Sequence, residues 1–235
     1  MDIVEGVEIK DLSLYLKNEK VLVLSDFHIG YEEALNKQGI FIPRFQYEEI
    51  ISRLKNIFEG LDVKKVVILG DLKHEFGTIS ETEWRNTLQL IDFLAGYCAK
   101  IVLIKGNHDT ILGPIAAKRN IKVKRFLKLG DFFMCHGHFI PKKIDTKIII
   151  IGHEHPAVGL KKDSRVEFFK CFLKGTWNKK TLIVVPSFNL VNEGTDVLRE
   201  EILSPFLMQD LSKFNVFVVS DKVYDFGKLE NLRRL

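Results

Sequence analysis

The stretch KVVILGDLKHE, residues 65–75, contains the pattern that decides the fold. An unbroken apolar, β-branched run ends in a glycine, and an aspartate and a histidine follow within the next four residues. A continuous run of this kind is typical of a strand that is covered on both faces. Asp71 and His74 then fall in the loop that follows the strand. We therefore expect functional residues at the carboxyl end of a buried strand.

Four other stretches repeat this arrangement. Apolar runs lead into SDFHIG, GNHD, CHGH and GHEH, and with the first stretch these motifs contain all seven histidines of the chain. Imidazoles confined to strand ends predict one site assembled from several loops. The polar residues placed in this way are Asp26, His28, Asp71, His74, Asn107, His108, Asp109, His136, His138, His153 and His155.

Length and composition are those of an ordinary globular protein. The 235 residues are 46% hydrophobic and 28% charged, and the formal net charge of +4 does not by itself indicate a nucleic-acid partner. No apolar run approaches the roughly 18 residues of a membrane span. The acidic start MDIVEGVEIK does not resemble a signal peptide. The three cysteines lack CxxC spacing, so we expect a cytoplasmic protein without disulfides.

Hydrophobic periodicity predicts alternating strands and helices in the first half of the chain and mostly strands in the second. The chain contains no internal repeat and no linker-like segment. The pattern therefore indicates one α/β domain over residues 1–235, with a two-layered sheet core flanked by helices. Strands are predicted over 21–25, 65–70, 101–106, 132–137, 147–153, 181–188 and 215–220. Helices are predicted over 47–61, from Ser80 to about 94, over 111–119 and over 198–211.

The residue types at the strand ends indicate a metal site. Aspartate and asparagine oxygens mixed with imidazole nitrogens suit Mn, Fe or Zn better than calcium, which prefers oxygen alone. In Asp26-x-His28 and His153-x-His155 the paired side chains share a face of a strand. Where the strand turns into a loop, they can converge on one ion or divide between two.

A pair of ions would explain the number of donors. Two ions about 3.5–4 Å apart can clamp a phosphoryl group and hold a bridging hydroxide for in-line attack. Such a pair needs one shared carboxylate, and Asp71, which follows a glycine at a strand end, is the natural choice. The leaving group also needs a proton donor that is not a ligand. His108 fits this role, and Asp109 could orient its ring.

In this order the motifs resemble those of the calcineurin-like metallophosphoesterase family. They span residues 26–155 and are specific as a set, although GD or HG alone would mean nothing. The resemblance implies a four-layer α/β fold with two packed mixed β-sheets flanked by helices. It also implies a metal-dependent phosphoester hydrolase with two divalent ions, Mn²⁺ being preferred and Fe or Zn being alternatives.

The resemblance further implies a role for each motif residue. His108 and Asp109 would assist catalysis, and His74 would help to position the phosphate. One ion would be held by Asp26, His28 and His155. The other would be held by Asn107, His136 and His153, with Asp71 shared by both.

Finer features resemble a narrower group. SDFHIGYEEA and GDLKHE are similar to motifs of the nuclease subunit in double-strand-break repair complexes. GHEHP with the later PSFN, GTD and LSPF is similar to small archaeal phosphoesterases and to bacterial phosphoesterases found beside a DNA ligase. This resemblance implies a phosphodiesterase that acts on DNA, RNA or nucleotide diesters, and a DNA-repair protein as a partner to consider.

Two departures from the repair nucleases limit this expectation. Only 80 residues follow His155, where those nucleases carry a further DNA-contacting domain, and position 73 is a lysine. Processive action on duplex DNA is therefore in doubt, whereas hydrolysis of a small or flexible diester is not. Lys73 would place a cation near the substrate. Tyr31 and Arg44 could also contact the substrate, although packed or solvated roles suit them equally.

Several alternatives stay open. His138 lies beyond the HG pair and is expected near the ligands or at the surface, and Cys135 is expected to be a small buried apolar residue. Within the enzyme class, a phosphomonoesterase or a cyclic-nucleotide phosphodiesterase would use the same motifs. Outside it, the fold can serve as a protein-binding scaffold with an idle metal site, but such proteins usually lose the GNHD histidine, which is present here as His108. The oligomeric state has no signal in the sequence.

Overall fold

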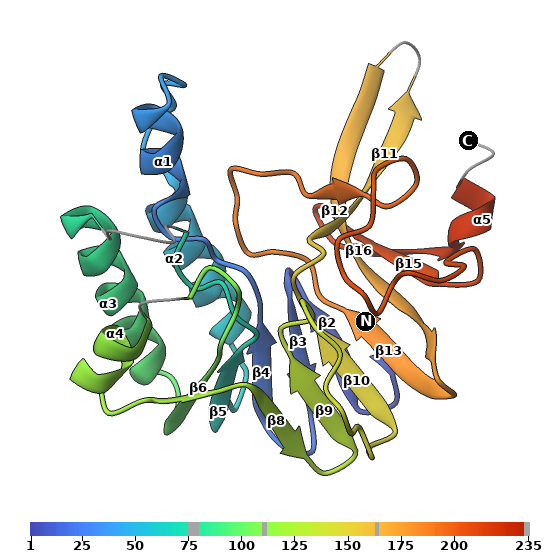
Figure 1. The fold of residues 1–235 in the computed structure, drawn as a ribbon, viewed down its shortest axis with the longest axis horizontal. Coiled ribbons are helices and arrows are strands. Elements are labelled where there is room, and N and C mark those ends of the chain that lie inside the picture. The colour runs from blue at the N-terminus through green and yellow to red at the C-terminus, as the bar shows by residue number, and fades with distance from the viewer. Residues whose placement is uncertain (75–79, 110–111, 163–164, 233–235) are drawn as a thin grey trace.

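Two β-sheets pack face to face, and helices cover the outer side of the first (Figure 1). The computed structural model describes residues 1–74, 80–109, 112–162 and 165–232. The first sheet has the order β1-β2-β3-β4-β5-β6-β7, antiparallel up to β4 and parallel from β4 onward. Its strands are β1 (Asp2–Val4), β2 (Val7–Lys10), β3 (Ser13–Leu16), β4 (Val21–Leu24), β5 (Lys65–Ile68), β6 (Lys100–Ile104) and β7 (Lys122–Lys124).

The second sheet has the order β14-β11-β12-β13-β10-β9-β8, and β15 and β16 continue it from β12. Its centre, β9-β10-β13, is parallel, whereas the β11–β12 hairpin is antiparallel. Its strands are β8 (Phe126–Leu129), β9 (Phe132–Cys135), β10 (Ile148–Ile151), β11 (Pro156–Lys162), β12 (Arg165–Trp177), β13 (Lys180–Val184), β14 (Thr195–Asp196), β15 (Asn215–Val219) and β16 (Val223–Lys228).

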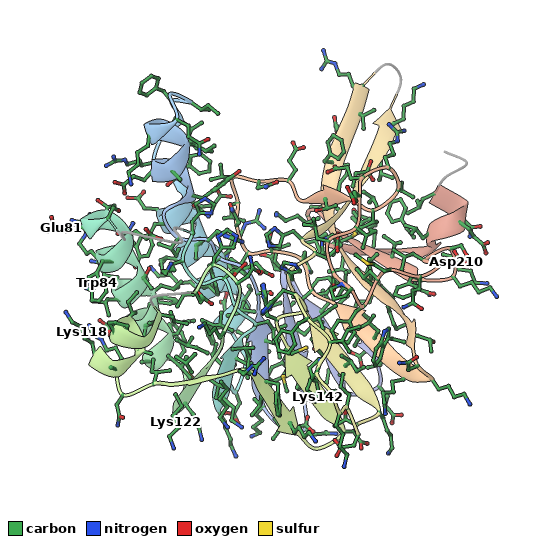
Figure 2. The ribbon with its side chains drawn as sticks, viewed as in Figure 1. Glu81, Trp84, Lys118, Lys122, Lys142 and Asp210 are labelled. Atoms are coloured by element: carbon green, nitrogen blue, oxygen red, sulfur yellow. The ribbon has the colours of Figure 1, made fainter. Side chains whose placement is uncertain are left out.

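Helices α2 (Gln46–Phe58), α3 (Glu81–Ala95) and α4 (Leu112–Lys118) lie against the first sheet (Figure 1). Helix α1 (Tyr31–Lys37) stands above α2, beyond the end of the sheet, and α5 (Leu229–Leu232) lies near the carboxyl terminus (Figure 1). The predicted start of α3 is confirmed, because the Ser80 hydroxyl accepts a hydrogen bond from the Glu83 amide at 3.0 Å. On the surface, the Lys118 ammonium lies 4.9 Å from the ring centroid of Trp84, which joins α4 to α3 (Figure 2).

The alternation of side chains along the second sheet builds two cores. Phe132, Met134 and Ile150 point toward the first sheet and join the main core. Phe133 and Cys135 point the other way, into a second core that the segment 197–214 and α5 cover. The continuous apolar runs are explained by this burial on both faces.

Most of the predicted elements are confirmed, including all seven strands and the helices over 47–61 and from Ser80. The helix predicted over 111–119 is present as α4, although residue 111 lies outside the described residues. The helix predicted over 198–211 is wrong, because no described residue there is helical. Pro205 interrupts that stretch, and Phe206, Leu207 and Leu211 reach the second core from irregular backbone instead.

The α/β architecture with two packed mixed sheets is the one that the motifs implied. Short strands β1 to β3 and the long β11–β12 hairpin were not predicted. Among the described residues, no helix combines the length and the apolar character needed to cross a membrane.

Candidate metal centre

All five motif loops meet at one edge of the two sheets. Each loop leaves the carboxyl end of a parallel strand, and such ends lie at the same edge of a sheet. The placement is therefore a consequence of strand direction. Asp26 and His28 follow β4, Asp71 and His74 follow β5, Asn107 and His108 follow β6, His136 follows β9, and His153 and His155 follow β10.

The first donor cluster consists of Asp26, His28 and His155. One ligand atom from each lies within 4.8 Å of the others. The Nε2 atoms of His28 and His155 are 3.3 Å apart, and His155 Nε2 lies 3.4 Å from Asp26 Oδ1. This is the set that the resemblance implied for one ion.

The second donor cluster consists of Asp71, His136 and His153, with Asn107 beside it. His136 Nε2 lies 3.3 Å from Asp71 Oδ2 and 3.1 Å from His153 Nδ1. Asn107 Oδ1 lies 2.9 Å from the same His136 nitrogen. The structure thus brings all the residues implied for the other ion into contact.

Asp71 stands between the two clusters. Its Oδ2 atom is 3.3 Å from His136 Nε2 in the second cluster and 3.8 Å from His28 Nε2 in the first. Its other oxygen, Oδ1, accepts a hydrogen bond from the His108 amide at 2.9 Å. The side chain is 2% exposed, so its orientation is fixed by the protein rather than by solvent.

The backbone of the site is strained. Five of the seven expected ligands adopt left-handed conformations, which non-glycine residues rarely do. Each such residue costs about 1–3 kcal/mol and persists where the surrounding structure enforces it, typically at functional sites. The φ angles are 51° at Asp26, 47° at His28, 45° at Asp71, 67° at His153 and 51° at His155.

Two glycines allow the loops to approach this closely. A Cβ atom at Gly106 would overlap the backbone and carboxylate of Asp71, and one at Gly152 would overlap Ser25 and Asp26. Since these neighbours are buried and cannot move aside, any side chain at either position would displace a carboxylate of the site.

Charges within the site oppose one another. Burial alone would raise the pKa of Asp26, but His155 and His136 hold this pKa below its usual range. Burial would lower the pKa of His136, yet Asp26 and Asp71 raise it to about 9. The pKa values of His28 and His153 fall to about 3 and about 4, chiefly through burial. A cation is therefore favoured between the two carboxylates.

These features fit divalent metal ions. Asp26 Oδ1 is buried and has no hydrogen-bond partner among the described residues, although buried carboxylate oxygens normally have one. The oxygens of Asp26, Asp71 and Asn107 combine with imidazole nitrogens as in sites for Mn, Fe or Zn. Neutral His28 and His153 rings are also the form that binds a metal.

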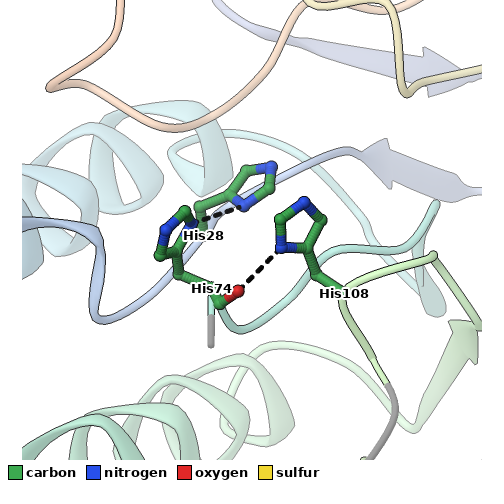
Figure 3. A group of neighbouring side chains, drawn as sticks. All are labelled: His28, His74 and His108. Carbon is green, nitrogen blue, oxygen red and sulfur yellow. Dashed lines mark hydrogen bonds between the residues drawn. The ribbon is translucent and has the colours of Figure 1, made fainter. Parts of the chain in front are cut away.

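Three imidazoles line the other side of the first cluster. Figure 3 shows His28, His74 and His108, from the loops after β4, β5 and β6, grouped together. His74 Nδ1 lies 3.3 Å from His28 Nδ1, and His108 Nδ1 lies 2.7 Å from the backbone oxygen of His74. Both His74 and His108 are only partly buried. They are therefore accessible to a substrate bound over the metal cluster.

The position of Asp109 differs from the prediction. Its carboxylate accepts hydrogen bonds from the Leu72 amide at 3.2 Å and the Gly106 amide at 3.0 Å, so it ties two ligand loops together. Burial and the nearby Asp71 raise the pKa of Asp109 to about 6. The acceptor that orients the His108 ring is the His74 backbone oxygen instead.

The three predicted substrate contacts are placed very differently. Lys73 is fully buried and its Nζ atom donates to the His108 backbone oxygen at 2.8 Å, so it supports a loop instead of facing solvent. Tyr31 packs edge-on against His74, with ring centroids 4.6 Å apart. Arg44 is exposed and lines a cavity of about 230 Å³ between α1, α2 and α3.

The uncertain motif residues also have defined places. His138 packs against His136, with ring centroids 5.1 Å apart, and its buried Nδ1 atom has no described hydrogen-bond partner. Cys135 is buried in the second core, where burial raises the pKa of its thiol to about 12, as expected for an apolar role. Glu154 turns away from the metal clusters and accepts hydrogen bonds from the amides of Leu203 and Ser204.

Sequence analysis missed several supporting residues. The Ser25 hydroxyl donates to Asp26, and Glu83 accepts a hydrogen bond from the His74 amide at 3.0 Å. Glu83 occupies the buried face of α3, which is otherwise apolar apart from Thr87. A carboxylate on the apolar face of a predicted helix was the signal that could have identified it.

Comparisons with protein families and with solved structures both found similar proteins. A model of the calcineurin-like phosphoesterase family matches residues 19–185. Nuclease MPE of Pseudomonas putida has a similar solved structure, with a TM-score of 0.65 and 21% identity over 93% of each chain. The phosphoesterase YfcE of E. coli gives a TM-score of 0.44 and 13% identity, over 89% of this chain and 97% of that one. A comparison with curated proteins gave no match.

The matched residues cover well over half of the chain and include both donor clusters. The likeness to nuclease MPE shows a shared fold. The activity class that this family match supports is phosphoester hydrolysis, and the chain belongs to the calcineurin-like phosphoesterase family.

Proposed function

We propose that the protein is a dinuclear-metal-dependent phosphodiesterase that acts on nucleic acid or nucleotide diesters. The observation that carries the proposal is the position of the Asp71 carboxylate between two donor clusters, with Oδ2 3.3 Å from His136 and 3.8 Å from His28. One cluster with a single carboxylate would suffice for one ion. A buried carboxylate shared by two clusters supports a pair.

Within this proposal, Asp26, His28 and His155 hold one ion, Asn107, His136 and His153 hold the other, and Asp71 is shared. When bound, the ions supply charge neutralisation and water activation for displacement at phosphorus. The mixed oxygen and nitrogen donors make Mn²⁺ the preferred metal, with Fe or Zn as alternatives.

His108 is the proposed proton donor to the leaving group. A backbone oxygen can only accept, so the 2.7 Å contact with His74 places a hydrogen on His108 Nδ1. Nε2 is then the atom that gains and releases a proton. Loss of such a general acid usually slows a reaction by about 10²–10⁴-fold. His74 is the proposed second contact to the phosphate, which its ring, 5.4 Å from that of His108, supports.

The choice of diesters over monoesters is the less direct part of the proposal. It is supported by the motifs after β4 and β5, which resemble those of repair nucleases, and by a fold shared with a protein named as a nuclease. A phosphomonoesterase is the rival within the enzyme class. An idle scaffold is disfavoured by the five strained ligand positions, because strained backbone of this kind clusters at functional sites.

The test compares two chromogenic substrates after metal removal. EDTA-treated protein is assayed with bis(p-nitrophenyl) phosphate and p-nitrophenyl phosphate, with and without Mn²⁺. We expect turnover only with Mn²⁺ and a higher kcat/KM for the diester. Turnover unaffected by EDTA would contradict metal dependence, and a higher kcat/KM for the monoester would replace the diesterase by a monoesterase.

A further inference from the structure

One segment supports the metal clusters from outside the family match. Residues 186–204, here called the strap, follow the matched residues 19–185. The strap includes the PSFN and GTD motifs, which the metal site does not use. Its second half already packs on the second core, through Val197, Leu198 and Ile202.

The strap bonds to three of the five ligand loops. Its Phe188 amide donates to the Ser25 backbone oxygen at 2.8 Å, and its Thr195 amide donates to the His155 backbone oxygen at 2.9 Å. Its Ser204 hydroxyl donates to the Gly137 backbone oxygen at 2.9 Å. The loops after β4, β9 and β10 are thus linked to one another through the strap.

Within the strap, Asn189 forms several hydrogen bonds around the loop of the first cluster. Its backbone N–H donates a hydrogen bond to the Asp26 backbone oxygen at 3.1 Å. Its side-chain Oδ1 accepts from Gln46 Nε2 at 3.1 Å and from the Val191 amide at 2.9 Å. Gln46 Nε2 also donates to the Phe27 backbone oxygen at 3.1 Å. Both Asn189 and Gln46 are 2% exposed.

These bonds surround the strained turn of the first cluster. Asp26 and His28 both have positive φ, and the ring of Phe27 between them packs at a tilt against that of Phe188, with ring centroids 5.0 Å apart. A turn in this conformation persists only where its surroundings enforce it. Asn189 and Gln46 hold its backbone oxygens, and Phe188 holds its central ring.

We propose that Asn189 is a positioning residue for the first metal site, acting with Gln46 to hold Asp26 and His28 in their ligand geometry. The inference rests on the proposed dinuclear function. The second site is less exposed to changes at Asn189, because none of the described hydrogen bonds of Asn189 reaches the loops of Asn107, His136 or His153. A change at Asn189 reaches the second site through Asp26, whose Oδ2 atom accepts a hydrogen bond from the His153 amide at 3.0 Å. Loss of the Asn189 side chain should therefore weaken the first ion more strongly than the second.

The test is a calorimetric titration of metal-free protein with Mn²⁺. Asn189→Leu removes the Oδ1 acceptor at similar volume, whereas Asn189→Asp retains it. Gln46→Met is a second, milder variant, should the Asn189→Leu protein fail to fold. Asn36→Leu is the matched control, because the Asn36 side chain also bonds a loop, at Ile42, and none of its described hydrogen bonds reaches a ligand loop.

Two reference variants assign the binding steps. His28→Ala weakens the first site and Asn107→Ala the second. In Asn189→Leu we expect the step lost in His28→Ala to weaken about 10–100-fold, the usual effect of removing support behind a metal ligand. The step lost in Asn107→Ala should remain. Asn189→Asp should restore most of the affinity, and Asn36→Leu should bind as the wild type does.

Equal weakening of both steps in Asn189→Leu, or no change in either, would overturn the proposal. So would the same loss in Asn36→Leu, since the effect would then reflect general destabilisation. Binding of a single ion by the wild type would contradict the dinuclear function instead. The role of Asn189 would then be decided by whether Asn189→Leu weakens that one ion.

Discussion

The floor of the site and its rim are built differently. At the floor, Asp26, Asp71 and His136 are at most 2% exposed and are fixed by hydrogen bonds or close packing from other loops. At the rim, His74 and His108 are partly exposed, and they contact each other through the His74 backbone oxygen and through their rings. A rigid floor suits metal binding, and an accessible rim suits contact with a changing substrate. Substitutions at the floor should therefore impair metal binding, whereas substitutions at the rim should impair contact with the substrate.

The largest effect is expected at the floor. Asp71→Ala removes the carboxylate shared by both clusters, so metal affinity and catalysis should be lost together. Losing several kcal/mol of charge stabilisation corresponds to a fall in kcat/KM of roughly 10³-fold or more. Metal content after dialysis and hydrolysis of bis(p-nitrophenyl) phosphate are the measurements. Retention of both ions would show that Asp71 is not shared.

The His108→Gln substitution, at the rim, should impair catalysis while leaving metal binding at the floor intact. We expect kcat to fall about 10²–10⁴-fold with both ions still bound, because a general acid acts only on the leaving group. The fall in kcat should be smaller for a substrate that releases p-nitrophenol, because this leaving group needs little protonation. It should be larger for a substrate with an alkoxide leaving group. An equal loss for both leaving groups would show that His108 acts on the metals or the phosphate.

His74→Ala tests the second rim residue and should have a smaller effect. Removing one hydrogen bond to a charged group costs about 1.5–3 kcal/mol, which corresponds to roughly a 10–100-fold fall in kcat/KM. The metal stoichiometry should be unchanged. Loss of one ion in this variant would place His74 among the metal ligands.

Lys170 contacts the strap and belongs to neither the floor nor the rim, so it provides a separate test. Its Nζ atom donates to Ser187 and to the Asn192 backbone oxygen, each at 2.7 Å, and burial lowers its pKa to about 7. Between this pKa and the ordinary value, the unfolded chain binds more protons than the folded one. The free energy of unfolding should therefore rise with pH above about 7, by at most about 1.4 kcal/mol per pH unit.

Lys170→Met should abolish that rise. Urea unfolding of the metal-free protein at pH 7 and pH 9 measures it, with the wild type gaining stability relative to the variant at the higher pH. An unchanged difference between the two proteins would show that Lys170 keeps an ordinary pKa. Activity of the metal-loaded protein should change least in this variant.

The same contrast explains what could be predicted. Asp26, Asp71 and His153 follow long apolar runs, so strand direction alone brings them to one edge. Their left-handed backbone has no counterpart in the sequence, because nothing in the residue type requires it. The outcome for the helix over 198–211 shows the opposite limit: apolar spacing was read as helix, although Pro205 and packing on the second sheet favour irregular backbone.

Supporting residues were harder to identify than ligands. Asn189 acts through contacts with Gln46, which lies 143 positions away in the sequence. Lys73 was expected to place a cation near the substrate, yet it is buried against the loop of His108. Such roles depend on tertiary contacts, which neither periodicity nor a motif encodes.

The most direct test of the two-ion account is activity as a function of metal stoichiometry. Metal-free protein, at a concentration well above the dissociation constants, is titrated with Mn²⁺ while hydrolysis of bis(p-nitrophenyl) phosphate is followed. The account predicts that activity rises until a break at two ions per chain. Full activity at one ion per chain, with no gain from a second, would contradict it.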